Sequence, residues 1–139
     1  IQGNEWVGVS LASASFCQVR DCELYENLIA LHLVESRNNT IENCVCHENA
    51  DAITLFQASQ DNQLRNCTCA RNSFTGIHIQ ESSGNHIIGC VCENGYDGIS
   101  MAYAPNTKMG TTRCGIMLRT LVLVPHRSQI FFVISTRQT

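Results

Sequence analysis

Cysteine is the residue type with the greatest capacity for chemistry in this sequence, at nine of 139 residues. Six of the nine form three Cys-x-Cys pairs: Cys44/Cys46, Cys67/Cys69 and Cys90/Cys92. On a β-strand this spacing puts both thiols on one face, about 7 Å apart, whereas thiolate zinc sites favour Cys-x2–4-Cys loops. Stacked strands also orient neighbouring thiols poorly for a disulfide, and an odd total leaves at least one thiol unpaired. The pattern favours free thiols stacked in a core over disulfides or a metal site.

Histidine is the next candidate for a ligand or a general base. His32 and His78 fall at equivalent positions, two units of a sequence repeat apart. In stacked strands that separation is roughly 9.6 Å, which is too far for the two rings to share a metal ion. His47, His86 and His126 have no evident partner in the sequence. We therefore predict no metal site and expect the histidines to be solvated surface residues.

Carboxylates decide whether the sequence carries a hydrolytic site, because a glycosidase needs two of them about 5–9.5 Å apart. Asp51 and Asp97 occupy like positions but are separated by a whole repeat unit, as are Glu35 and Glu81. No equivalent position shows acids on neighbouring units. We therefore assign no catalytic residue and no cofactor, and favour a non-enzymatic chain without excluding an enzyme.

One outward strip remains as a candidate binding surface. Its polar and aromatic residues alternate with the inward ones on the first strand of each unit: His32, Thr54, Phe56, His78, Gln80, Ser100 and Tyr103. Such side chains on a flat parallel sheet suit a glycan, which binds by ring stacking and hydrogen bonds. The alternative is a plain solvated sheet face.

The elements that position these residues are set by a repeat of 22–23 residues. The main apolar column is Val9, Leu31, Ile53, Ile77, Ile99 and Leu121, and a cysteine column is Cys22, Cys44, Cys67 and Cys90. An asparagine recurs at 27, 49, 72 and 94, where we expect a turn conformation with stacked amides. Apolar residues alternate within each unit, which predicts strands of three to five residues.

A coil of short strands that stacks on its neighbour satisfies this pattern. The fold predicted is an all-β, single-stranded parallel β-helix of about five to six coils, in which like residues lie about 4.8 Å apart along the axis. Small residues at 8, 30, 52, 76 and 98 suit a tight corner. Arg20, Glu42 and Arg65 share an outward column and are expected to form surface ion pairs.

The motif N-x-I-x-x-C/N-x-C-x-x-N followed by G-I-x-I, as in 38–49 and 84–94, resembles the right-handed parallel β-helix repeat of pectate-lyase-like proteins. The likeness covers about residues 4–114 and is closest to NosD-type and carbohydrate-associated modules. That family includes polysaccharide lyases and hydrolases, alginate epimerases, phage tailspikes, surface adhesins and the copper-associated periplasmic NosD protein. Its lyases cluster acids on adjacent coils around Ca²⁺, a pattern not apparent here.

The chain changes character after the repeats. All 12 acidic residues lie between Glu5 and Asp97, and the basic residues that follow are Lys108, Arg113, Arg119, Arg127 and Arg137. We predict repeats over 1–114 and leave two interpretations for 115–139: a divergent end coil that caps the core, or a foreign tail. Leu121, Leu123, Phe131 and Ile134 are the residues that a sixth coil would turn inward.

Composition narrows the function classes. With 44% apolar and 15% charged residues the chain can bury a core. A net charge of −3 argues against a nucleic-acid partner, and no apolar run is long enough to span a membrane. The first residue is Ile1 and no signal peptide is visible, so we expect a fragment.

The function predicted is a structural or carbohydrate-binding module of a larger secreted, cell-surface or periplasmic protein, with polysaccharide and neighbouring coils or domains as partners. The resemblance leaves two alternatives. One is a fragment of a polysaccharide lyase or C5-epimerase whose catalytic coils lie elsewhere. The other is a NosD-like periplasmic accessory protein for copper-centre assembly.

Overall fold

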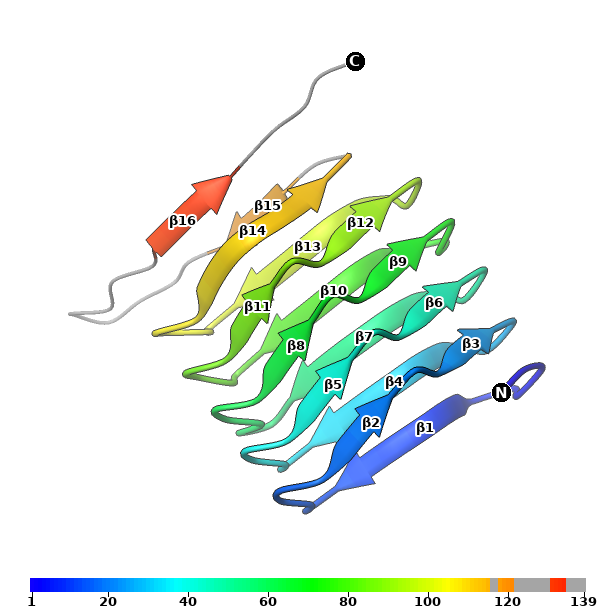
Figure 1. The fold of residues 1–139 in the computed structure, drawn as a ribbon, viewed down its shortest axis with the longest axis horizontal. Helices are drawn as coiled ribbons and strands as arrows, with labels where there is room; N and C mark the ends of the chain where they lie inside the picture. Colours follow the sequence, from blue (N-terminus) through cyan, green and yellow to red (C-terminus); the bar gives the residue numbers. More distant parts are fainter. Residues whose placement is uncertain (116–117, 122–130, 135–139) are drawn as a thin grey trace.

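The computed structural model describes residues 1–115, 118–121 and 131–134, and the strands wind through it as a parallel β-solenoid of about five turns (Figure 1). The described residues contain no helix, so none offers a long apolar helix for crossing a membrane. The predicted all-β fold of stacked coils is confirmed.

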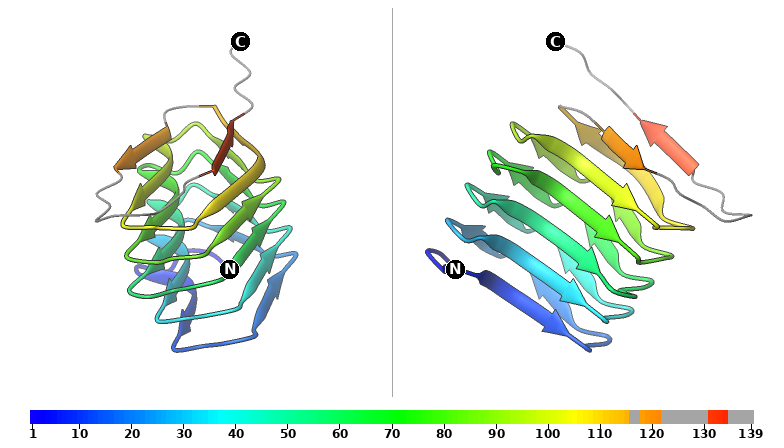
Figure 2. Two further views of the ribbon diagram at one scale, coloured as in Figure 1. Left: turned by 90° about the vertical axis from the view of Figure 1, so that its left-hand side faces the viewer. Right: turned by 180° about the vertical axis from the view of Figure 1, so that it is seen from behind.

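One sheet collects the first strand of every coil, all parallel. Its strands are β1 (Val7–Ala12), β4 (Ile29–Val34), β7 (Asp51–Phe56), β10 (Thr75–Gln80), β13 (Asp97–Ala102) and β15 (Leu118–Leu121). We number coils 1 to 5 from β1, β4, β7, β10 and β13. Successive strands of this sheet lie side by side up the stack in both views of Figure 2, although they are a whole repeat apart in sequence.

A second, bent sheet holds the shorter strands. One half contains β2 (Gln18–Arg20), β5 (Thr40–Glu42), β8 (Gln63–Arg65) and β11 (His86–Ile88). The other half contains β3 (Glu23–Tyr25), β6 (Val45–His47), β9 (Thr68–Ala70) and β12 (Val91–Glu93). The halves join through β14 (Lys108–Cys114), which pairs with β11, β12 and β16 (Phe131–Ile134).

The core fills the narrow interior with ladders of like residues. In the first sheet the fully buried column is Leu31, Ile53, Ile77 and Ile99, in register from coil to coil. Coil 1 continues the column with Val9, which is only partly buried. The predicted apolar columns are therefore confirmed through coil 5.

The small residues at 8, 30, 52, 76 and 98 were expected to suit a tight corner, but the structure gives a different reason for them. They lie at the second position of each first strand and face the interior, where Ala30 and Ala52 are fully buried. A side chain on Gly76 would place its Cβ 2.5 Å from the carbonyl oxygen of Gly98. Close approach of the next coil, rather than a positive φ, therefore requires the small side chain.

Asparagine ladders hold the corners, with a correction to their register. The backbone N–H and Nδ2 of Asn27 both donate to Oδ1 of Asn49, at 3.0 and 3.1 Å, and Asn49 contacts Asn72 in the same way. The left-handed residue is the one before each rung, such as Glu48 at φ 58°. Asn94 has φ 56° and so matches Glu48, which leaves Gly95 at the rung.

The sequence did not reveal a second asparagine ladder, formed by Asn39, Asn62 and Asn85. The N–H and Nδ2 of Asn39 donate to Oδ1 of Asn62, both at 3.0 Å, and Asn62 repeats the contact with Asn85. All three side chains are fully buried. Each rung therefore ties one coil to the next through its backbone as well as its side chain.

Beyond residue 114 the two sheets continue through β15 and β16, in a register that differs from the expected one. Ile99 pairs with Leu118, not with Leu121, and Met109 pairs with Phe132, not with Phe131. Leu123 lies outside the described residues.

Candidate functional site

The predicted strip lies on the outer face of the first sheet, where the backbone pairing places its residues in two rows. In the first row, His32 pairs with Thr54, Thr54 with His78, and His78 with Ser100. Phe56 and Gln80 end the strands β7 and β10, two residues further along. Parallel in-register stacking therefore gathers side chains that are far apart in sequence.

An aromatic cluster stands at the centre of this face. The Phe56 ring meets the His32 ring edge to face with centroids 5.6 Å apart, and the His78 ring in the same way at 4.8 Å. Beneath it, Nδ1 of His32 lies 2.6 Å from the Thr54 hydroxyl. Thr54 is fully buried, so the predicted strip presents its neighbours rather than Thr54 itself.

Burial keeps the two histidines uncharged near neutral pH. Desolvation lowers the pKa of His32 below its ordinary value. Desolvation also lowers the pKa of His78, although the nearby Asp51 and Asp97 carboxylates partly oppose it. The histidines therefore offer ring faces and neutral hydrogen-bonding nitrogens to a ligand, and they add no positive charge to the face.

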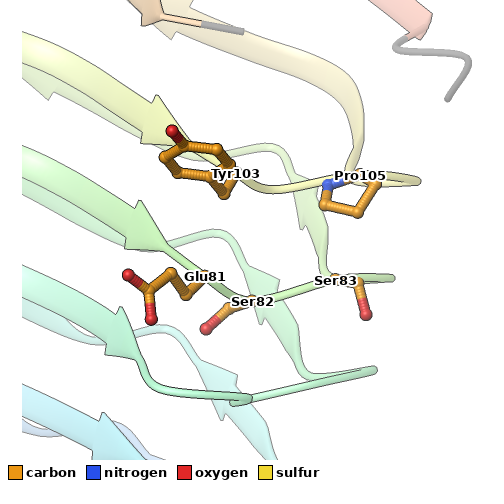
Figure 3. Close-up of a pocket in the computed structure, with 5 residues that line it drawn as sticks. All are labelled: Glu81, Ser82, Ser83, Tyr103 and Pro105. Carbon is orange, nitrogen blue, oxygen red and sulfur yellow. The ribbon is translucent and has the colours of Figure 1, made fainter. Parts of the chain in front are cut away.

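The corner that follows the first strands is hollowed. A shallow pocket of about 390 Å³ is lined by Glu81, Ser82 and Ser83 of coil 4 with Tyr103 and Pro105 of coil 5 (Figure 3). Beside it, an open groove of about 840 Å³ has the lining Ser15, Glu35, Arg37, Gln57, Ala58 and Glu81. Tyr103, which the sequence placed on the strip, belongs to the pocket wall.

The sequence predicted that no two acidic residues occupy equivalent positions on neighbouring coils. This holds for Glu35 and Glu81 but not for Glu26 and Glu48. Ala58 donates its N–H to the carbonyl oxygen of Glu81, so a coil does separate Glu81 from Glu35. Glu26 and Glu48, however, occupy the same left-handed position on adjacent coils. The expectation of no neighbouring acids was therefore wrong, although Arg71 binds Glu48 at 3.2 Å.

An exposed apolar column borders the same sheet, and the sequence analysis missed it. One residue immediately precedes each first strand, and four of these five are large, apolar and exposed: Trp6 (74%), Leu28 (45%), Phe74 (60%) and Tyr96 (62%). The fifth is Ala50. Their spacing of 22–24 residues between coils could have predicted the column. It was not recognised in the sequence because the four residues are of four different types.

The cysteine ladders are confirmed as core packing. Cys46 pairs with Cys69 and Cys69 with Cys92 in register, and all nine thiols are free. Desolvation raises the pKa of the Cys46 thiol well above its ordinary value. A hydrogen bond to Cys67, together with burial, raises that of Cys44. Neutral, buried thiols such as Cys44 and Cys46 are poor nucleophiles and poor ligands. The direction is opposite for Cys90, where a hydrogen bond with Cys67 lowers the thiol pKa.

His47 is not the partnerless surface residue that we expected. Its ring stacks on Tyr25 with centroids 5.0 Å apart, and its Nε2 lies 3.1 Å from a carboxylate oxygen of Glu23. His86 lies half-buried on β11, and His126 falls outside the described residues. Within the described part of the chain, no three Cys, His, Asp or Glu side chains gather as a metal site.

Comparison with known proteins agrees with this geometry. The family model described as "Right handed beta helix region" matches residues 1–118. No curated protein and no solved structure matches the chain. The match covers most of the sequence, including every strand from β1 to β14. On this match and the stacked parallel strands, the chain belongs to the right-handed β-helix family.

Proposed function

We propose that this β-helix is a carbohydrate-binding module that takes a glycan on the outer face of the first sheet. The side chains that contact the glycan are those of His32, Phe56, His78, Gln80, Ser100 and Tyr103. The hydroxyl of Thr54 orients the His32 ring through its hydrogen bond. The module belongs, in this proposal, to a larger secreted, cell-surface or periplasmic protein that uses the solenoid as a rigid spacer.

The observation that carries the proposal is the Phe56 ring, which contacts the His32 ring and the His78 ring, each at nearly a right angle. Sugar rings present apolar faces that stack on aromatic side chains and hydroxyls that bond to polar ones. Hydrogen bonds between coils fix the strands that carry these rings, so little conformational entropy is lost when a ligand binds.

The two alternative functions, a lyase or epimerase fragment and a NosD-like accessory protein for copper-centre assembly, have less support. A lyase or epimerase of the predicted kind needs free acids on adjacent coils, whereas Glu48 of the Glu26/Glu48 pair binds Arg71 and lies beside His47. A copper-assembly role needs surface thiols or histidines in a cluster, whereas six of the nine cysteines are buried. We therefore retain binding as the proposed activity.

Calorimetric titration with soluble oligosaccharides of neutral, uronic and amino sugars tests the proposal. We expect at least one class to bind and Phe56→Ala to weaken that binding about tenfold, a loss of about 1.4 kcal/mol. Ile88→Ser, which changes a 39% exposed side chain on the other sheet, is the matched control and should bind normally. Binding by no class, or full affinity in a folded Phe56→Ala protein, contradicts the proposal.

A further inference from the structure

The exposed column of Trp6, Leu28, Phe74 and Tyr96 calls for an explanation that packing does not supply. Three of the four side chains are at least 60% exposed. Scattered exposed apolar residues are ordinary, but a row of them along one edge of a sheet is typical of an interaction surface. The row also borders the face that carries the proposed glycan site.

The backbone holds this column rigidly. Ile29 donates its N–H to the carbonyl oxygen of Trp6 at 2.9 Å, and Asp51 donates to Leu28 at 3.0 Å. Asp97 donates to Phe74 at 2.9 Å. Four steps of about 4.8 Å make the column roughly 19 Å long. A row of large apolar side chains on a fixed backbone, interrupted at Ala50, favours a linear ligand that lies along the solenoid axis.

The charge around this surface has one dominant sign. Asp51 and Asp97 begin their strands directly after the apolar column, and both act electrostatically on His78. Glu35 and Glu81 line the groove at the opposite ends of the strands. Arg37 is the cationic side chain in that groove, and the two histidines are uncharged near neutral pH.

This charge selects among glycans. A polymer of uronic acids brings its own carboxylates and would be repelled, whereas ammonium groups would be attracted. From the exposed column and its flanking carboxylates together, we infer that the ligand is a cationic polysaccharide of amino sugars, whose ring faces pack on the apolar column. This inference rests on the proposed function and adds the class of glycan.

The test compares a glucosamine hexamer with an N-acetylglucosamine hexamer and an oligogalacturonate by calorimetry. At about pH 6.5 ordinary Asp and Glu side chains are ionised, and the lowered pKa values of His32 and His78 leave both rings largely uncharged, so the surface keeps its negative charge. We expect the glucosamine hexamer to bind about tenfold more tightly than its acetylated counterpart, with affinity that falls as salt rises. The oligogalacturonate should not bind.

Two pairs of variants locate the effect. Asp97→Asn should reduce the preference for the charged hexamer several-fold, whereas Glu93→Gln on β12 removes a carboxylate from another face and should not. Phe74→Ser should weaken binding of both amino-sugar hexamers. Its control is Phe16→Ser, which changes a 79% exposed ring at a different corner.

The outcomes separate the inference from the proposed function. Equal or tighter binding of the acetylated hexamer, or of the oligogalacturonate, overturns the inference and leaves glycan binding standing. Binding of no glycan overturns both. If an oligolysine peptide displaces the glucosamine hexamer with tighter affinity, a basic protein segment is the better ligand and the inference is again overturned.

Discussion

The middle coils and the end coils of this solenoid are built on one backbone plan but held differently. Coils 2 to 4 carry Ser36, Ser59 and Ser82 at one corner and a buried asparagine ladder at the next. Coil 1 has Ala14 and Cys17 at these positions, and coil 5 has Ala104 and Thr107. Within the described part of the chain, the buried hydroxyl of Thr107 has no hydrogen-bond partner. Side-chain ladders, and not strand pairing alone, therefore distinguish the interior of the stack.

Burial distinguishes coil 1 from the later coils. Leu31, Leu33 and Ile41 of coil 2 are fully buried, whereas Leu11 and Val19 of coil 1 are only partly buried. The outer-face cluster of His32, Phe56 and His78 lies on coils 2 to 4, where the inward residues of the first sheet, Leu31, Ile53 and Ile77, are fully buried. We expect this region to open last when the protein unfolds.

The largest contrast is expected in thiol reactivity. Iodoacetamide should modify the partly exposed Cys17 fastest in the native protein. Cys22 and Cys114 are also partly exposed, but burial raises the pKa of Cys22 and a hydrogen bond with Cys92 raises that of Cys114, so both should react more slowly than Cys17. The six buried thiols should react about a thousandfold more slowly, because their modification requires local or global opening. Mass spectrometry of peptides labelled with and without urea measures the ratio. Equal labelling of all nine thiols in the native state contradicts the buried ladders.

A ladder residue in a middle coil should matter far more than its counterpart in an end coil. Asn62→Ala removes the acceptor of two Asn39 donors and the donor to the Ser36 carbonyl, and we expect a loss of about 3–5 kcal/mol in unfolding free energy. Thr107→Val removes a buried hydroxyl for which the described residues provide no hydrogen-bond partner, and we expect no loss of unfolding free energy. Urea unfolding curves give both values, and similar losses in the two variants would show that ladders do not distinguish the coils.

Acid should destabilise the middle coils through His32 and His78. Both pKa values are lowered in the folded protein by desolvation, so the unfolded chain binds protons more readily. Stability is therefore full above the unfolded value of about 6.5 and falls as the pH drops toward the folded values. Melting temperatures from about pH 8 to pH 5 should show this decline, and the double variant His32→Gln, His78→Gln should flatten it. An unchanged slope in that variant assigns the decline to other groups.

The smallest effect is expected at the surface between coils 1 and 2. Nε of Arg20 lies 3.4 Å from a carboxylate oxygen of Glu42, as the shared column predicted, whereas the guanidinium of Arg65 donates to the side chain of Gln63. Both side chains are partly exposed, so Arg20→Ala should cost about 0–1 kcal/mol, and less at high salt. A double-mutant cycle with Glu42→Ala measures the coupling. A coupling well above this range would mean that surface charge, too, holds the end coil.

Much of this fold could be predicted from the sequence because the inward columns repeat either one residue type, such as cysteine, or one class of side chain, such as the branched aliphatic residues. The Val9/Leu31/Ile53 column and the Cys-x-Cys pairs marked the inward positions directly. The asparagine register failed in coil 4, because Asn94 follows the 22–23 residue spacing although the backbone puts it one residue before the rung. A repeated residue type alone does not distinguish the left-handed residue at a corner from the neighbouring residue that forms the asparagine ladder.

Only part of the candidate site could be predicted from the sequence, because residue spacing gives the face of a strand but not the contacts between side chains. His32, Phe56 and His78 could be placed on one face by strand alternation, but their ring contacts depend on side-chain packing that no spacing rule gives. The bordering column of Trp6, Leu28, Phe74 and Tyr96 shares exposure rather than residue type. Exposure is a property of the folded corner, so the structure was needed to recognise it.

An NMR titration of the labelled protein with a glucosamine oligomer tests the outer-face site most directly. The account predicts shifts for amides of β4, β7 and β10 around His32, Phe56 and His78, and for the indole N–H of Trp6, the only tryptophan. Resonances of Val45 and Ile88, on the other sheet, should stay in place. Shifts confined to that other sheet, or no shifts at any ligand concentration, would contradict it.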